Sequence, residues 1–111
     1  MVDKSIAAII RHYLVVLAEA GIHARKAVLF GSFARGEGGE FSDIDLIVIA
    51  PEFDRTYDMS LVEELWRTRL RADMRIEPIP CGEREWEMEG DRPILEIARR
   101  EGLEIGIVSP Q

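Results

Sequence analysis

The segment from Val28 to Ile49 constrains the fold most, because two short apolar runs in it flank a polar loop. The first run, Val28–Phe30, ends at Gly31-Ser32, and the second, Ile44–Ile49, follows a loop rich in glycine and acidic residues. Both runs have the length and β-branched content of strands, with turn residues at their ends. The segment therefore predicts a strand, a loop and a second strand that pairs with the first.

Two aspartates lie at the start of the second strand, two positions apart. Side chains with this spacing in a strand point to the same face, so Asp43 and Asp45 should project together. Neighbouring carboxylates repel each other unless a cation lies between them, and such hard oxygen ligands suit Mg²⁺ or Mn²⁺. Strand pairing would bring Gly31-Ser32 near that cation, where its backbone N–H groups and hydroxyl can bind a phosphate. The combination indicates a site for a nucleoside triphosphate.

The alternative is that Gly31-Ser32 is only a turn and Ser42-Asp43 only the entry to a strand. It explains Asp43 but not Asp45, which is an acid inside an otherwise apolar strand. Glu77 is a second acid inside a predicted strand and could supply a third carboxylate for two metal ions. Its alternative is a solvent-facing glutamate paired with Arg75 or Arg71.

Hydrophobic periodicity and turn residues predict the remaining elements. They are a helix at Asp3–Ala20 capped by Asp3 and ended by Gly21, strands at Ala27–Phe30 and Ile44–Ile49, a helix at about Asp58–Ala72 with Trp66 in the core, a strand at Met74–Pro80, one or two helical turns in Gly82–Glu89, a helix capped by Asp91 and ended by Gly102, and a short strand at Leu103–Ile107. Prolines at 78 and 80 predict an edge strand. The fold class is α/β (α+β): a small mixed sheet flanked by helices, in one domain spanning 1–111.

Composition restricts the functions that this domain can have. The net charge of −7 argues against direct binding of nucleic acid, which needs clustered Lys and Arg. No apolar run approaches the ~20 residues that span a membrane. A lone cysteine, Cys81, cannot form an internal disulfide and reads as a half-buried packing residue, so we expect a cytoplasmic protein. An unpaired edge strand would allow a homo-oligomer.

The sequence GSFARGEGGEFSDIDLIV, residues 31–48, resembles the signature of the DNA polymerase β-like nucleotidyltransferase superfamily. More narrowly, it is similar to the minimal nucleotidyltransferases of bacteria and archaea. The resemblance extends to the first helix, to the helix after the second strand and to the acid Glu77, and so covers most of the chain. It implies the nucleotidyltransferase fold.

The resemblance implies a role for each matching residue. Gly31-Ser32 matches the turn that binds the β- and γ-phosphates of a nucleotide such as ATP, and Asp43 and Asp45 match the carboxylates that bind Mg²⁺, with two ions expected. Glu77 stands near the third carboxylate, which binds the catalytic metal and helps to deprotonate the acceptor hydroxyl. The implied reaction is attack of that hydroxyl on the α-phosphorus, with pyrophosphate as the leaving group.

Arg35 stands where family members often carry an arginine that balances triphosphate charge; the alternative is a surface arginine beside Glu37. The third acid departs from the pattern, because it is a glutamate instead of the usual aspartate and Pro78 follows it. The extra methylene moves the carboxylate by about one bond length, on the order of the 1 Å misplacement that can cost a hundredfold in rate.

The minimal enzymes are typically encoded with helical HEPN-type toxins and act as antitoxins by adding AMP to a tyrosine of the toxin. The resemblance therefore implies a Mg²⁺-dependent transfer of AMP from ATP to such a partner. Two alternatives stay open. One is transfer to a small hydroxyl compound such as an aminoglycoside, although nothing in this short chain suggests a second substrate lobe. The other is an antitoxin that acts by binding alone and retains a vestigial site.

Overall fold

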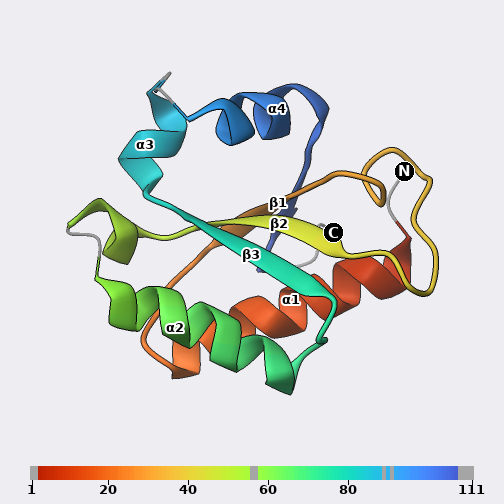
Figure 1. Ribbon diagram of the computed structural model, residues 1–111. Coiled ribbons are helices and arrows are strands. Elements are labelled where there is room, and N and C mark those ends of the chain that lie inside the picture. Colours follow the sequence, from red (N-terminus) through yellow and green to blue (C-terminus); the bar gives the residue numbers. More distant parts are fainter. Residues whose placement is uncertain (1–2, 56–57, 89, 91, 108–111) are drawn as a thin grey trace.

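The computed structural model describes residues 3–55, 58–88, 90 and 92–107. A four-stranded sheet in the order β3-β2-β1-β4 forms its centre (Figure 1). β2 runs antiparallel to β1 and parallel to β3, whereas β4 is antiparallel to β1, so the sheet is mixed as predicted. The strands are β1 (Lys26–Phe30), β2 (Ile44–Ile49), β3 (Ile76–Cys81) and β4 (Leu103–Gly106). The presence of β4 confirms the strand predicted at the end of the chain.

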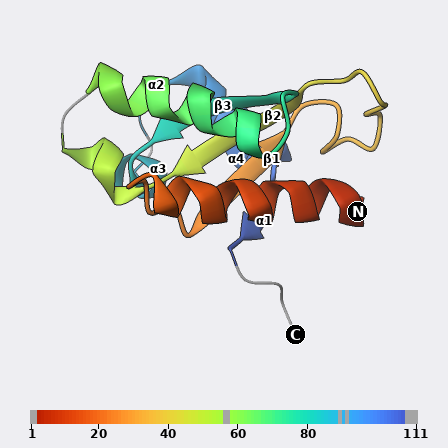
Figure 2. The same cartoon turned by 90° about the horizontal axis from the view of Figure 1, so that it is seen from below.

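Helices cover both faces of the sheet. The two α-helices that precede β3 in the chain lie on one face, as the view from below shows (Figure 2). The two α-helices that follow β3 lie on the other face (Figure 1). The helices are α1 (Lys4–Glu19), α2 (Met59–Thr68), α3 (Glu83–Glu87) and α4 (Pro93–Glu101), with single 3-10 turns η1 (Pro51–Asp54) and η2 (Arg69–Arg71). No helix among the described residues is long and apolar enough to cross a bilayer. This layered arrangement confirms the predicted fold class.

The predicted caps of the first helix are present. Oδ1 of Asp3 accepts a hydrogen bond from the backbone N–H of Ser5 at 2.8 Å, which satisfies one of the free donors at the start of α1. The helix ends before Gly21, whose φ of +98° is the left-handed conformation that glycine adopts most readily. The face of α1 that carries Ile10, Leu14 and Leu17 is fully buried against the sheet.

Alternation along β2 divides the core into two layers. Ile44, Leu46 and Val48 belong to the larger cluster with α1, whereas Ile47 and Ile49 belong to the smaller cluster with α4. Asp45 shares the parity of Ile47 and Ile49, so its side chain lies on the α4 face of the sheet. Ile44 and Leu46, the neighbours of Asp45 in the chain, point to the opposite face. The candidate site therefore lies on the α4 face.

β3 is an edge strand, as its prolines predicted. The N–H of Ile44 donates to the carbonyl of Arg75, and the N–H of Ala50 donates to that of Cys81, so odd-numbered residues of this strand bond to β2. The backbone nitrogens of Pro78 and Pro80 therefore point away from β2, where a missing donor breaks no ladder bond. Nη1 of Arg92 also donates to the outward carbonyl of Pro80 at 3.1 Å. Both features oppose pairing of a further strand at this edge.

Several predicted details were wrong. The second helix ends at Thr68 and continues as the 3-10 turn η2, and the third strand begins at Ile76 instead of Met74. Trp66 is not a core residue: it is 39% exposed, and the guanidinium of Arg69 lies 4.8 Å from the centroid of its ring. Cys81 is fully buried instead of half-buried. The predicted cap Asp91 lies outside the described residues.

Candidate active site

The Gly31 turn lies directly against the carboxylate of Asp45. Phe30, the last residue of β1, is paired with Asp45 of β2, and Gly31 follows with a φ of +77°. A Cβ atom at this glycine would lie 3.2 Å from Cγ of Asp45 and closer still to Oδ2. Only glycine therefore fits here, both for its conformation and for the close approach. The turn and the acid of the motif form one site in the structure.

The loop after Gly31 begins with a helical turn. The N–H groups of Ala34 and Arg35 donate to the carbonyl of Gly31 at 3.1 and 3.2 Å, and the N–H of Glu37 donates to that of Ser32 at 2.8 Å. These bonds fix the backbone of Ser32 at the start of a structured turn, directly after the glycine that lies against Asp45.

The three predicted carboxylates lie near the starting ends of the neighbouring strands β2 and β3. Asp45 of β2 and Glu77 of β3 are paired in the parallel register and therefore project from the same face. Asp43 precedes β2 and is exposed, as Glu77 is. Among the described residues, however, no three His, Cys, Asp or Glu side chains are arranged to hold a metal ion. Asp45 and Glu77 thus lie side by side on neighbouring strands, and Asp43 is two residues before Asp45 in the chain.

Electrostatics at Asp45 favour a bound cation. Burial is the main cause that raises the pKa of this carboxyl, and the negative charge of Asp43 raises it further, while the positive charge of Arg35 lowers it. The ionised form is therefore disfavoured in the protein alone, and a cation between the aspartates would relieve the cost. Carboxylate oxygens and a hydroxyl are donors that Mg²⁺ prefers, so the residues present fit that ion.

The structure shows the surface pairing that was considered as the alternative role of Arg35. Its Nε contacts Oε2 of Glu37 at 3.0 Å on the surface, which is the pairing of the alternative. Its charge also acts on Asp45. The alternative for Glu77, an ion pair with Arg75 or Arg71, is not observed among the described residues. Arg75 instead contacts Asp73, and Arg71 contacts Glu19, each at 2.9 Å.

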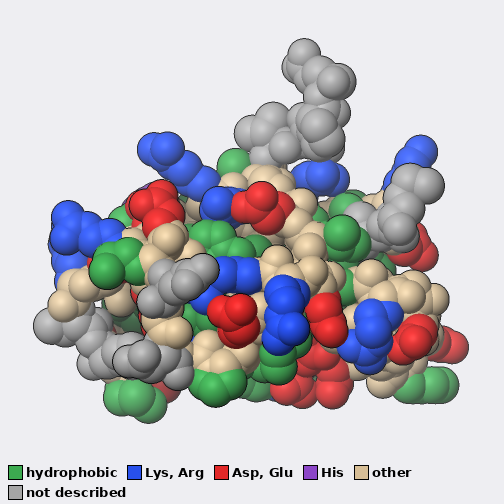
Figure 3. Space-filling model, turned by 90° about the horizontal axis from the view of Figure 1, so that it is seen from above, with side chains coloured by type: hydrophobic (Ala, Val, Ile, Leu, Met, Phe, Trp, Pro, Cys, Tyr) green, Lys and Arg blue, Asp and Glu red, His purple; other side chains and the backbone are tan. Residues whose placement is uncertain are grey.

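A hollow of about 310 Å³ on the same face of the sheet lies away from these acids. Its lining includes Lys26, Ile49 and Trp86, and Ile49 is at the opposite end of β2 from Asp45. The view onto this face shows acidic and basic side chains interspersed (Figure 3). Nothing in this hollow matches the chemistry of the motif.

Comparisons with known proteins identify a family and a shared fold. The nucleotidyltransferase domain family matches residues 16–93, which include the Gly-Ser turn and all three acids. A crystal structure of a protein from Sulfolobus solfataricus, provisionally named a nucleotidyltransferase, superposes with a TM-score of 0.62 at 15% sequence identity, covering 88% of this chain and 77% of that one. At this identity the likeness shows a shared fold. No curated protein matched the chain. The chain belongs to the nucleotidyltransferase domain family.

Proposed function

We propose that this chain transfers AMP from ATP to a hydroxyl group of a protein acceptor, in a reaction that requires Mg²⁺. Nucleotidyl transfer in general is the activity that the family supports. The observation that carries the assignment to these residues is the contact between Gly31 and Asp45, with Glu77 in register on the next strand. A phosphate-binding turn beside paired acids is the arrangement that this chemistry requires.

Each residue then has a defined task. Backbone N–H groups of Gly31-Ser32 and the Ser32 hydroxyl bind the β- and γ-phosphates, while Arg35 offsets triphosphate charge. Asp43 and Asp45 hold the metal ions, with Glu77 as third ligand. Two Mg²⁺ ions held by these residues would supply stabilisation of negative charge on the attacking and leaving oxygens.

The reaction balances as a single displacement at phosphorus. The acceptor oxygen forms a bond to the α-phosphorus, the bond from that phosphorus to the bridging oxygen breaks, and pyrophosphate leaves. Glu77 takes the proton of the acceptor hydroxyl.

A protein acceptor is favoured by the surface beside the site. Arg75 Nη1 donates to the carbonyl of Glu40 at 3.3 Å, so the loop before Asp43 lies against the start of β3. The chain neighbours of these two residues, Phe41 and Met74, are 92% and 68% exposed. Large apolar side chains that are exposed at this end of the molecule are available for contact with a protein partner. We propose that the acceptor is a tyrosine of a helical, HEPN-type partner, with this chain as its antitoxin.

A second candidate is neutralisation of the partner by binding alone. It is supported by the absence, among the described residues, of three acids arranged to hold a metal, and by the glutamate at position 77. The two candidates differ in what happens when the aspartates are neutralised. A binding antitoxin keeps its effect in the double variant Asp43→Asn, Asp45→Asn, whereas an enzyme loses it.

Binding of nucleotide and metal tests the enzymatic proposal before any acceptor is known. We expect the wild type to bind a fluorescent ATP analogue tightly only when Mg²⁺ is present, and Asp45→Asn to lose that metal dependence. A matched control is Asp54→Asn, which removes an exposed acid from η1. If the wild type binds the analogue equally with and without Mg²⁺, or does not bind it, nucleotidyl transfer is excluded.

A further inference from the structure

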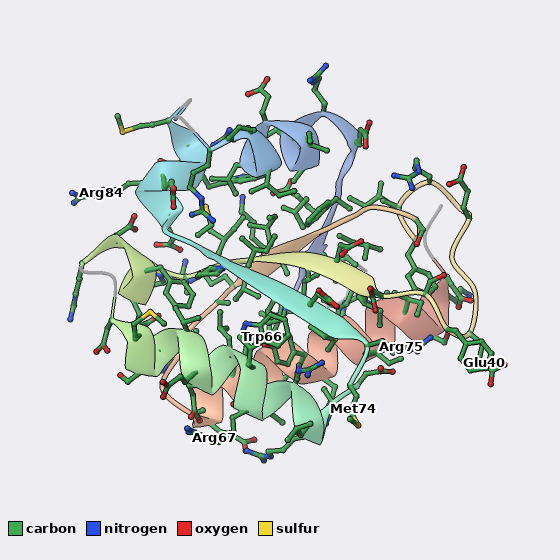
Figure 4. All side chains as sticks on the ribbon, in the orientation of Figure 1. Glu40, Trp66, Arg67, Met74, Arg75 and Arg84 are labelled. Carbon is green, nitrogen blue, oxygen red and sulfur yellow. The ribbon has the colours of Figure 1, made fainter. Side chains whose placement is uncertain are left out.

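We propose that Arg75 is a positioning residue that holds the phosphate-binding loop, residues 31–41, in its working shape. The inference rests on the proposed function, since it gives that loop the task of binding triphosphate. Arg75 lies at the start of β3, at the end of the sheet where Glu40 also lies (Figure 4). In sequence it is separated from the loop by more than thirty residues, and the sequence interpretation considered it only as a partner for Glu77.

The guanidinium is first fixed by Asp73. Nε of Arg75 contacts Oδ1 of this aspartate at 3.0 Å, and Nη2 contacts Oδ2 at 2.9 Å. Two parallel contacts of this kind orient the planar group as well as binding it. The backbone N–H of Arg75 donates to the same carboxylate at 2.8 Å. The side chain is therefore held in one orientation relative to β3.

The fixed guanidinium then contacts the loop at two points. Nη1 donates to the carbonyl of Glu40 at 3.3 Å, on the return side of the loop. On the outgoing side, the guanidinium carbon lies 5.9 Å from the centroid of the Phe33 ring, within the range of a cation–π contact. The ring packs in turn on Gly38, where a Cβ atom would collide with three of its carbons. Arg75 thus joins both sides of the loop to the sheet.

This arrangement acts on the site through the loop. Phe33 directly follows Ser32, so a change in the position of its ring moves the residues that are proposed to bind phosphate. All three nitrogens of the Arg75 guanidinium already contact Asp73 or Glu40, and its charge is balanced by that of Asp73. Direct binding of phosphate would require it to leave these partners. The contacts therefore favour a positioning role.

Removal of Asp73 separates the two roles. If Arg75 acts through the loop, Asp73→Ala should weaken ATP binding much as Arg75→Ala does, because the guanidinium loses its orientation. If Arg75 bound phosphate directly, Asp73→Ala would release the guanidinium and would preserve or improve affinity. The effects of the two substitutions should also be non-additive in the double variant. Arg84→Ala, at the opposite end of the molecule (Figure 4), is the matched control for loss of an arginine.

Two readouts are needed, and the first requires no activity. We expect amide hydrogen exchange in residues 34–42 of the nucleotide-free protein to rise about tenfold in Arg75→Ala and in Asp73→Ala, but not in Arg84→Ala. We expect KM for ATP to rise about tenfold in the same two variants, which equals a loss of about 1.4 kcal/mol. The value of kcat should fall less, because Asp45 and Glu77 remain in place on β2 and β3.

Unchanged loop exchange in Arg75→Ala, with the variant folded, would overturn the proposal whatever the effect on ATP. Stronger ATP binding by Asp73→Ala would also overturn it and would assign Arg75 to the phosphate itself. A wild type that binds no ATP would refute the proposed function but not the positioning role of Arg75, because the exchange experiment would still report on the loop. The two failures are therefore distinguishable.

Discussion

Replacement of Gly31 by alanine tests the geometry of the site at its tightest contact. The residue has a φ of +77°, and the new Cβ atom would lie 3.2 Å from Cγ of Asp45. An unstrained contact between such atoms needs about 3.5–4.0 Å, and the carboxylate oxygen is closer still. Because the carboxylate is the movable partner, we expect it to turn away from the turn by on the order of 1 Å.

The substitution should have two separable effects, a loss of stability and a loss of function. The left-handed conformation costs an alanine about 1–2 kcal/mol, which lowers Tm by roughly 5–10 °C in a domain of this size. The displacement of Asp45 adds a functional loss, because a 1 Å error in a reacting group can cost about a hundredfold in rate. Gly21→Ala supplies the control: its φ is +98°, and no atom lies within 4 Å of the added Cβ.

Thermal unfolding and Mn²⁺ binding measured on both variants separate the two effects. We expect Gly21→Ala and Gly31→Ala to lose similar stability, and only Gly31→Ala to lose metal affinity and the metal-dependent binding of ATP. If Gly31→Ala binds Mn²⁺ as well as Gly21→Ala does, the close contact with Asp45 does not matter for the metal. The reasoning about this site would then be refuted.

Three further predictions concern stability, reactivity and pH. Tyr13→Phe should lower the free energy of unfolding by about 1 kcal/mol in urea titrations, because the buried hydroxyl donates to the carbonyl of Leu65 at 2.7 Å; equal stability would contradict this. Burial raises the pKa of the Cys81 thiol to about 12, so a thiol reagent at mildly alkaline pH should label it far faster in unfolded than in native protein. Because the pKa of Asp45 is raised in the folded state, its ionisation opposes folding above that pKa, and this penalty disappears as the pH falls through it. Without metal, Asp45→Asn should therefore be more stable than wild type at neutral pH and lose that advantage in acid; a less stable variant at neutral pH would refute the assignment.

The strand pair and its acids were predictable from sequence because their signals are local. Alternation in Ile44–Ile49 places Asp45 on one face without any knowledge of the rest of the fold. Glycine at position 31 and the Ser-Asp sequence that follows the loop mark where the strands end and begin. The prolines of β3 likewise indicate an edge, since a missing N–H is tolerated only there. For such residues, backbone geometry alone determines the position.

The features that sequence did not predict depend on contacts between distant segments. Trp66 has the helical spacing of a core residue, but α2 rotates it partly into solvent beneath Arg69. Arg75 contacts a loop that ends more than thirty residues earlier, and no local pattern indicates that contact. Tertiary packing decides each of these cases.

Radiolabel transfer tests the central claim most directly. The wild type and Asp45→Asn would each be incubated with Mg²⁺ and with the protein encoded next to this chain, using ATP labelled either at the α-phosphorus or at the γ-phosphorus. The account predicts label in the acceptor only with wild type and only from the α-position, because AMP is transferred and pyrophosphate leaves. Label from the γ-position would show phosphoryl transfer instead. Absence of label with wild type, combined with neutralisation of the partner by both proteins, would contradict the enzymatic account and leave a binding antitoxin.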